Sequence, residues 1–181
     1  MKKIILSLLI TALTLSVFAQ KKTTTSAIIA FDATTALDPL PKAENKTVVA
    51  ALDTKTGTIE FEAAMKNFSF TNSRMQEHFN NASWMNSDQF PASTFTGKIT
   101  NLKAVNFSKN GTYSADVEGD LTIRGVTQKA SSKASVVVEN GKLKCNAEFS
   151  INLDDYKISA NQIIAGKVSK EPKITVSAEF N

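Results

Sequence analysis

The residues that could do chemistry in this chain are few and scattered. The chain has one histidine, His78, and one cysteine, Cys145. Metal sites need several His, Cys or carboxylate ligands at defined spacing, and no such group is present. The phosphate-binding and nucleophile motifs G-x-G-x-x-G, G-x-x-x-x-G-K-[ST] and G-x-S-x-G are also missing. We therefore expect no metal, no cofactor and no enzymatic activity.

Carboxylates beside the histidine leave one catalytic alternative open. Glu77 precedes His78, and the acidic residues Asp53, Asp88, Asp154 and Asp155 could complete an acid/base pair. No spacing selects any of them, so an enzyme would need a site that the sequence does not show.

Cys145 lies in the clearest strand of the chain. Leu143, Cys145, Ala147, Phe149, Ile151 and Leu153 alternate with polar residues, as expected for a strand with one buried face. A lone cysteine cannot form an intramolecular disulfide. We interpret Cys145 as a small hydrophobic side chain of the core.

A second strand-like stretch runs from Tyr113 to Gln128, with apolar residues on one parity and polar residues on the other. Gly119 and Gly125 interrupt it, which favours a bulge or a close backbone approach in a strongly curved sheet. Such curvature is typical of a closed barrel.

Further strands are expected on both sides of these two. They are Ala27 to Thr35, Lys46 to Asp53, Thr58 to Phe70 with a change of parity near Asn67, Thr94 to Phe107, Val126 to Glu139 and Ile174 to Phe180. Asn110-Gly111 and Asn140-Gly141 are hairpin signals. The pattern predicts an all-β fold, an eight-stranded antiparallel up-and-down β-barrel with one short helix, and a two-layer sandwich is the alternative.

Two segments break the strand pattern. Asn72 to Met85 places apolar side chains at helical spacing and is expected to form a short helix or a helical loop. Asp154 to Pro172 is expected to be a long loop whose first residues, Tyr156 and Ile158, pack inward.

The N-terminus is typical of an exported protein. Lys2 and Lys3 precede an apolar run that ends at Val17-Phe18-Ala19, a sequence that suits signal peptidase. We expect cleavage after Ala19, which makes residues 1–19 the signal peptide and residues 20–181 the domain, in the periplasm or secreted. The run is shorter than the about 20 apolar residues of a membrane span, so stable membrane insertion after cleavage is not expected.

Charge excludes one class of partner. Without the first 19 residues the net charge falls from +4 to 19 − 17 = +2, because Lys2 and Lys3 are lost. So small a charge, without a basic cluster, argues against nucleic acid. A homodimer stays open.

Two segments carry a resemblance to a known family. Gly119 to Gln128, G-D-L-T-I-R-G-V-T-Q, resembles the signature strand of the YceI-like family, and Met75 to Phe95 is similar to that family's His-containing helical stretch and the strand that follows. The resemblance implies a lipocalin-like barrel that holds an isoprenoid or other long-chain lipid in an apolar lumen.

The lumen implied by this resemblance would be lined by large apolar side chains. We expect the lipid to contact Phe61, Met65, Phe68, His78, Phe79, Trp84, Phe90, Phe95, Leu121, Ile123, Phe149, Ile151 and Tyr156. A barrel of eight strands can either hold one small ligand or fill itself with side chains. The same residues would form an ordinary core in a filled, structural barrel.

His78 has two readings. The family resemblance suggests a polar group at the mouth of the lumen, whereas an ordinary helix histidine would bond only to a backbone carbonyl. Many family members have Arg-Asp two and three residues before this histidine, where the chain has Met75 and Gln76. The lumen is therefore expected to favour a neutral or less acidic ligand.

Overall fold

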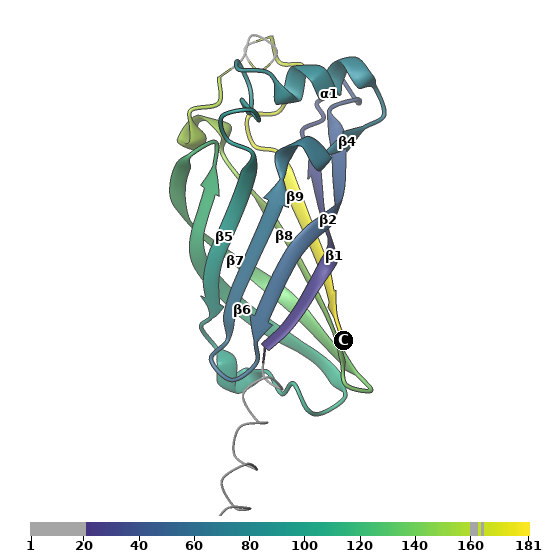
Figure 1. The fold of residues 1–181 in the computed structure, drawn as a ribbon, viewed down its shortest axis with the longest axis vertical. Helices are drawn as coiled ribbons and strands as arrows, with labels where there is room; N and C mark the ends of the chain where they lie inside the picture. Colours follow the sequence, from purple (N-terminus) through teal and green to yellow (C-terminus); the bar gives the residue numbers. More distant parts are fainter. Residues whose placement is uncertain (1–20, 160–162, 164) are drawn as a thin grey trace, which may run out of the picture.

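Eight long strands form a closed ring. The computed structural model describes residues 21–159, 163 and 165–181, so the proposed signal peptide lies outside the described residues. The strands of the ring are β1 (Lys21–Asp32), β2 (Lys42–Asp53), β3 (Thr58–Ala64), β5 (Ala92–Ile99), β6 (Gly111–Ile123), β7 (Val126–Glu139), β8 (Lys142–Ser150) and β9 (Lys173–Phe180). Each strand pairs antiparallel with its neighbour in the chain, and β9 returns to β1 (Figure 1). The predicted eight-stranded antiparallel up-and-down barrel is confirmed.

The change of parity that was predicted near Asn67, in the third strand, marks the end of a strand. β3 stops at Ala64, a 3₁₀ turn (η1, Met65–Asn67) follows, and the short strand β4 (Ser69–Phe70) pairs with β2. The turn rotates the chain, so that Met65 and Phe68 are both buried although they differ in parity.

The fourth predicted strand is shorter than expected. β5 ends at Ile99, because Thr100 and Asn101 bond to β6 through side chains. Asn101 Oδ1 accepts from Asp116 N at 2.8 Å, and Thr100 Oγ1 donates to Asp116 O at 3.2 Å. A 3₁₀ turn, η2 (Leu102–Ala104), then continues the chain in place of the expected strand.

Two hairpin turns use left-handed backbone. Asn140 and Gly141 have φ of 51° and 82° and join β7 to β8, as predicted. Arg124 and Gly125, with φ of 51° and 73°, join β6 to β7. The stretch from Tyr113 to Gln128 is therefore not one strand, and Gly125 is a turn residue, because only glycine tolerates this conformation freely.

Gly119 allows neighbouring atoms of β5 to approach the backbone of β6 closely. It pairs with Gly97 across β5 and β6 in an uninterrupted ladder, so there is no bulge. A Cβ at Gly119 would lie 2.5 Å from Thr96 O and 2.7 Å from Cζ of Phe95. The two glycines thus make room in the wall for the ring of Phe95.

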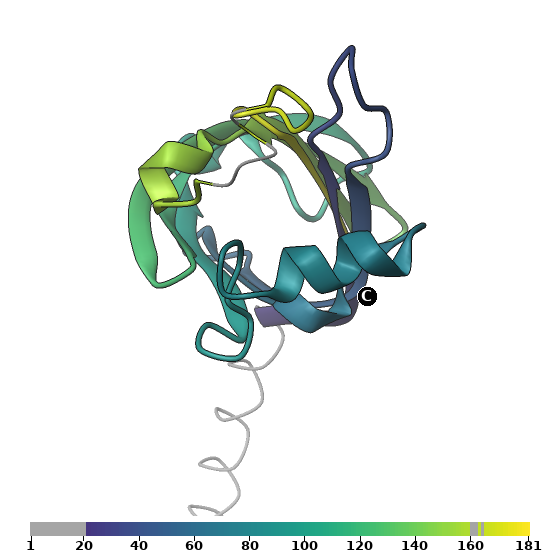
Figure 2. The ribbon, with the colours of Figure 1, turned by 90° about the horizontal axis from the view of Figure 1, so that it is seen from above.

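Short elements cover one end of the barrel, called here the upper end. Helix α1 (Ser73–Asn80) lies across one side of it, and a 3₁₀ turn, η3 (Leu153–Tyr156), lies on another (Figures 1 and 2). The expected helix to Met85 is shorter, since the chain turns at Asn81, whose N–H is bonded to Glu77 O and His78 O. Tyr156 and Ile158 are buried, as predicted.

The lower end is packed with side chains. The residues buried there include Val105, Ala115, Val138 and Leu143.

Within the described part of the chain, no helix combines the length and the hydropathy that crossing a bilayer requires.

Candidate functional site

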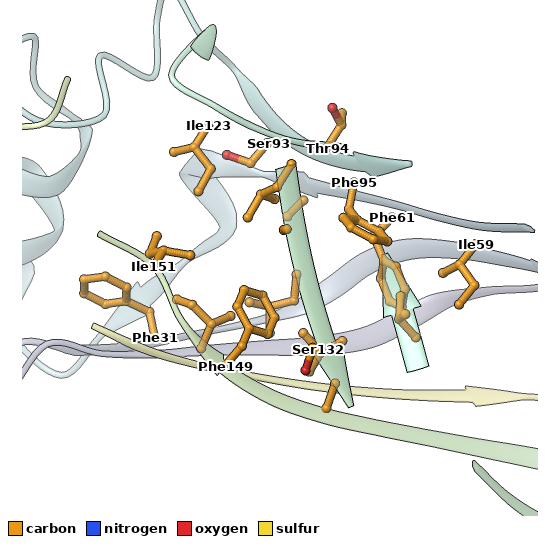
Figure 3. Close-up of a pocket in the computed structure, with 18 of the residues that line it drawn as sticks. Phe31, Ile59, Phe61, Ser93, Thr94, Phe95, Ile123, Ser132, Phe149 and Ile151 are labelled. Atoms are coloured by element: carbon orange, nitrogen blue, oxygen red, sulfur yellow. The ribbon is translucent and has the colours of Figure 1, made fainter. Parts of the chain in front are cut away.

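An apolar cavity of about 190 Å³ occupies the barrel interior above the packed lower end. Its wall is built from the inward parity of the strands and is capped by Phe79, Trp84 and Met85 from the segment of α1. Figure 3 shows the labelled side chains of several strands converging on this space, among them Phe61 and Phe95, which face each other across β3 and β5. The lining of the cavity is apolar, as the binding of a hydrophobic ligand would require.

Most of the residues expected to contact a ligand lie on this wall. They are Phe61, Met65, Phe68, Phe79, Trp84, Phe95, Leu121, Ile123, Phe149 and Ile151. Alternation brings the strand residues inward, and the turn after β3 brings in Phe68. Whether a ligand contacts them stays a prediction.

Three of the expected residues lie away from the cavity. His78 is exposed, because the neighbouring Phe79 takes the inward face of α1 and the helix turns His78 outward. Phe90 is half-buried beside the β6–β7 turn, where a Cβ on Gly125 would lie 2.5 Å from its ring. Tyr156 is buried at the edge of a different, smaller cavity described below. The placement of His78 does not support a role at the mouth of the lumen.

Sequence reasoning missed many residues of the wall, most of them aliphatic, because it selected mainly aromatic side chains. The signal was present in the strand parity. The missed residues include Ile29, Phe31, Leu52, Ile59, Ile99, Val117, Ala147, Ile174 and Val176.

Aromatic packing holds α1 against the barrel. The ring centroid of Phe79 lies 6.1 Å from that of Phe31, 5.7 Å from Phe68 and 5.1 Å from Phe70, all in tilted arrangements. Such pairs are favourable beyond the area that they bury. Phe79 therefore anchors the helical cover over the cavity.

Cys145 faces the cavity from β8 and is half-buried. Burial raises the pKa of its thiol to about 11, which keeps the side chain neutral at physiological pH. Its expected role as a small hydrophobic residue agrees with this environment.

Charged side chains of the barrel strands form ion pairs on the outer surface. Examples are Lys129 with Asp120 at 2.7 Å, and Lys133 with Asp116 at 2.9 Å. Exposed ion pairs such as these contribute little to stability.

No group of three or more His, Cys, Asp or Glu among the residues that the structure describes could hold a metal ion. The cavity wall itself carries no charged side chain among those residues.

A closed antiparallel barrel around an apolar cavity defines the lipocalin-like class of folds. The sequence profile of the YceI-like domain matches residues 13–180. The chain therefore belongs to the YceI-like family, and the predicted resemblance is confirmed.

Solved structures agree on the fold. A polyisoprenoid-binding domain from Saccharophagus degradans has a TM-score of 0.75 at 10% identity, covering 90% of this chain and 98% of that one. BcnA from Burkholderia cenocepacia has a TM-score of 0.70 at 14% identity, covering 86% and 96%. The Campylobacter jejuni YCEI protein has a TM-score of 0.53 at 19% identity, covering 74% and 80%. A comparison of this chain with curated proteins found no match.

Proposed function

We propose that this protein is a non-enzymatic lipid-binding protein that holds an isoprenoid or other long-chain apolar ligand inside the barrel. The observation that carries the proposal is the cavity of about 190 Å³, whose wall is almost entirely apolar. A soluble domain ordinarily packs its interior without such a space. An apolar cavity of this size favours a ligand-binding barrel over a purely structural one.

The physical chemistry of the wall fits a hydrocarbon chain. Each CH₂ group that leaves water contributes about 0.8 kcal/mol, so ten of them contribute about 8 kcal/mol before the entropic cost of binding. Phe61, Leu121 and Ile151 offer contacts and no hydrogen bonds. Affinity would therefore come from chain length.

Two further observations support the proposal. The chain belongs to the YceI-like family, and one structural neighbour is a polyisoprenoid-binding domain. The N-terminal sequence supports export, with the mature protein in the periplasm or secreted and the lipid carried, stored or sequestered there. Catalysis on the lipid is the weaker reading, because His78 lies outside the cavity.

Mass spectrometry of an organic extract of the natively purified protein tests the proposal. We expect a stoichiometric long-chain lipid and competitive displacement of a hydrophobic fluorescent dye from the emptied protein. A clean extract together with no dye binding would contradict lipid binding.

A matched pair of variants places the binding inside the barrel. Ala147→Trp fills the cavity from β8, whereas Lys144→Trp puts the same ring on the outer face of that strand. We expect Ala147→Trp to weaken dye binding at least tenfold and Lys144→Trp to leave it unchanged, with thermal unfolding used to show that both variants are folded.

A further inference from the structure

The barrel wall has a gap between β7 and β8. Their ladder runs from Glu139–Lys142 to Ala134–Ala147 and stops there. Above that pair, β7 continues to bond to β6 as far as Val126, and β8 continues to bond to β9 as far as Ser150. The facing edges of these two strands therefore separate towards the upper end.

Hydrogen bonds frame the gap below and above. Ser132 Oγ donates to Glu148 O at 3.3 Å at its lower border, and Gln128 Nε2 donates to Asp155 O at 2.9 Å at its upper border. Between them lies a second cavity of about 170 Å³. We call this opening the window, and its lining residues are Gln128, Lys129, Ala130, Ser131, Phe149, Ser150, Ile151, Asn152, Asp155 and Tyr156.

The window adjoins the large cavity. Ala130, Ser131, Phe149 and Ile151 line both spaces. Figure 3 shows Ser132, Phe149 and Ile151 among the side chains that border the large cavity. The two spaces therefore border the same part of the barrel wall.

A tyrosine of the window makes no side-chain hydrogen bond to another described residue. Tyr156 is 3% exposed, and no described residue accepts a hydrogen bond from its Oη. The other tyrosine of the chain, Tyr113, donates from its Oη to Lys109 O at 2.8 Å. Burial, together with the neighbouring Asp155, raises the pKa of Tyr156, so its hydroxyl stays protonated and able to donate. Among the described residues, the buried polar side-chain atom without a partner is Arg124 Nε, so the Oη of Tyr156 is open to the space that it lines. A ligand oxygen in the window could accept a hydrogen bond from it.

The charges around the window indicate an uncharged head group. Lys129 is held by Asp120 at 2.7 Å, and Asp155 is the other ionisable carboxylate or amine of the described lining. The one cation of the described lining is thus already paired with a carboxylate. A phosphate group would need several convergent cations, whereas the window offers Tyr156 Oη, Ser131 Oγ and the separated strand edges.

We propose that the window binds an uncharged oxygen-bearing head group, a hydroxyl or a carbonyl, of the lipid whose chain occupies the barrel cavity. This inference rests on the proposed function. It adds a polar subsite, and it places the head group at the side wall of the barrel.

Two ligands that differ by one oxygen test the subsite. The dye-displacement affinity of a long-chain prenyl alcohol is compared with that of the hydrocarbon of the same chain. We expect the emptied protein to prefer the alcohol by about 2- to 12-fold, the range for one net hydrogen bond. Tyr156→Phe should remove most of this preference without changing the affinity for the hydrocarbon.

Tyr113→Phe is the matched control, since it removes the hydroxyl that bonds to Lys109. It should keep the full preference. Ser131→Ala provides a second test in the window and should also reduce the preference.

The outcomes separate the two proposals. If neither ligand binds the emptied protein, both the lipid-binding function and the subsite are wrong. If both bind equally well, or if the preference survives in Tyr156→Phe and Ser131→Ala, the subsite is wrong and the lipid-binding function stands.

Discussion

At the scale of one residue, the reactivity of the single thiol of the chain is a measure of burial at the cavity wall. Cys145 lies on the cavity wall, and its pKa is raised from 9.0 to about 11 by burial. Alkylation requires the thiolate. At pH 8 the folded protein therefore holds roughly a hundredth of the thiolate of an unperturbed cysteine, by the tenfold change per pH unit.

We predict that iodoacetamide modifies Cys145 slowly at pH 8 and that the rate keeps rising with pH through 9 and 10. The unfolded chain in guanidinium should instead react fast, reach half of its maximal rate near pH 9, the ordinary pKa of the thiol, and level off above that pH. Mass spectrometry of timed samples measures both rates. A folded protein that reacts as fast as the unfolded chain would show that the thiol is not in this buried environment.

Residue types alone identified part of the wall. Alternation along β3 and β8 was sufficient to place Phe61 and Phe149 on the inner face. Phe90 could not be placed in this way, since its position depends on the β6–β7 turn, which lies far from it in the sequence. Local periodicity says which side chains share a face, and it does not say which distant residue covers that face.

At the scale of elements, one side chain joins the covers of the upper end. Arg124 lies in the β6–β7 turn, and its Nη1 donates to Lys157 O at 2.9 Å while Nη2 donates to Ala82 O at 3.1 Å. The acceptors belong to the segment after η3 and the segment after α1. Arg124 therefore ties two separate loops to the rim of the barrel.

We predict that Arg124→Met lowers the free energy of unfolding by about 1–3 kcal/mol, because hydrogen bonds from a charged donor are lost. Hydrogen exchange should rise around Ala82 and Lys157, and a bound dye should dissociate faster. The chain's other arginine, the exposed Arg74 on α1, supplies the control Arg74→Met, for which we expect no change. Equal effects of the two substitutions would argue against the tie.

Element order was predictable, and element ends were less so. The Asn140-Gly141 signal located one hairpin, because asparagine and glycine accept left-handed backbone. The turn at Arg124-Gly125 was missed, since arginine rarely adopts a positive φ and the polar alternation continues through it. The gap between β7 and β8 has no local signal either, because Val126–Glu139 and Lys142–Ser150 both read as regular strands.

At the scale of the whole molecule, a ligand in the cavity should raise stability. A ligand that binds only the folded state adds about 2.7 kcal/mol at a hundred times its Kd. For a domain of this size we predict a rise in Tm of about 5–10 °C. Differential scanning fluorimetry with and without a long-chain prenyl alcohol measures it, and an unchanged Tm at saturating ligand would contradict binding to the native state.

The ring also imposes an order on assembly. The pairing of β1 with β9 joins Ile28 to Ser177, so the strand that closes the barrel comes from the far end of the chain. Contacts between such distant residues are slow to form. Until β9 docks, the future interior is an open apolar trough with two free edges. We therefore expect the cavity to close only when β9 docks, and a chain that lacks this strand to be prone to aggregation.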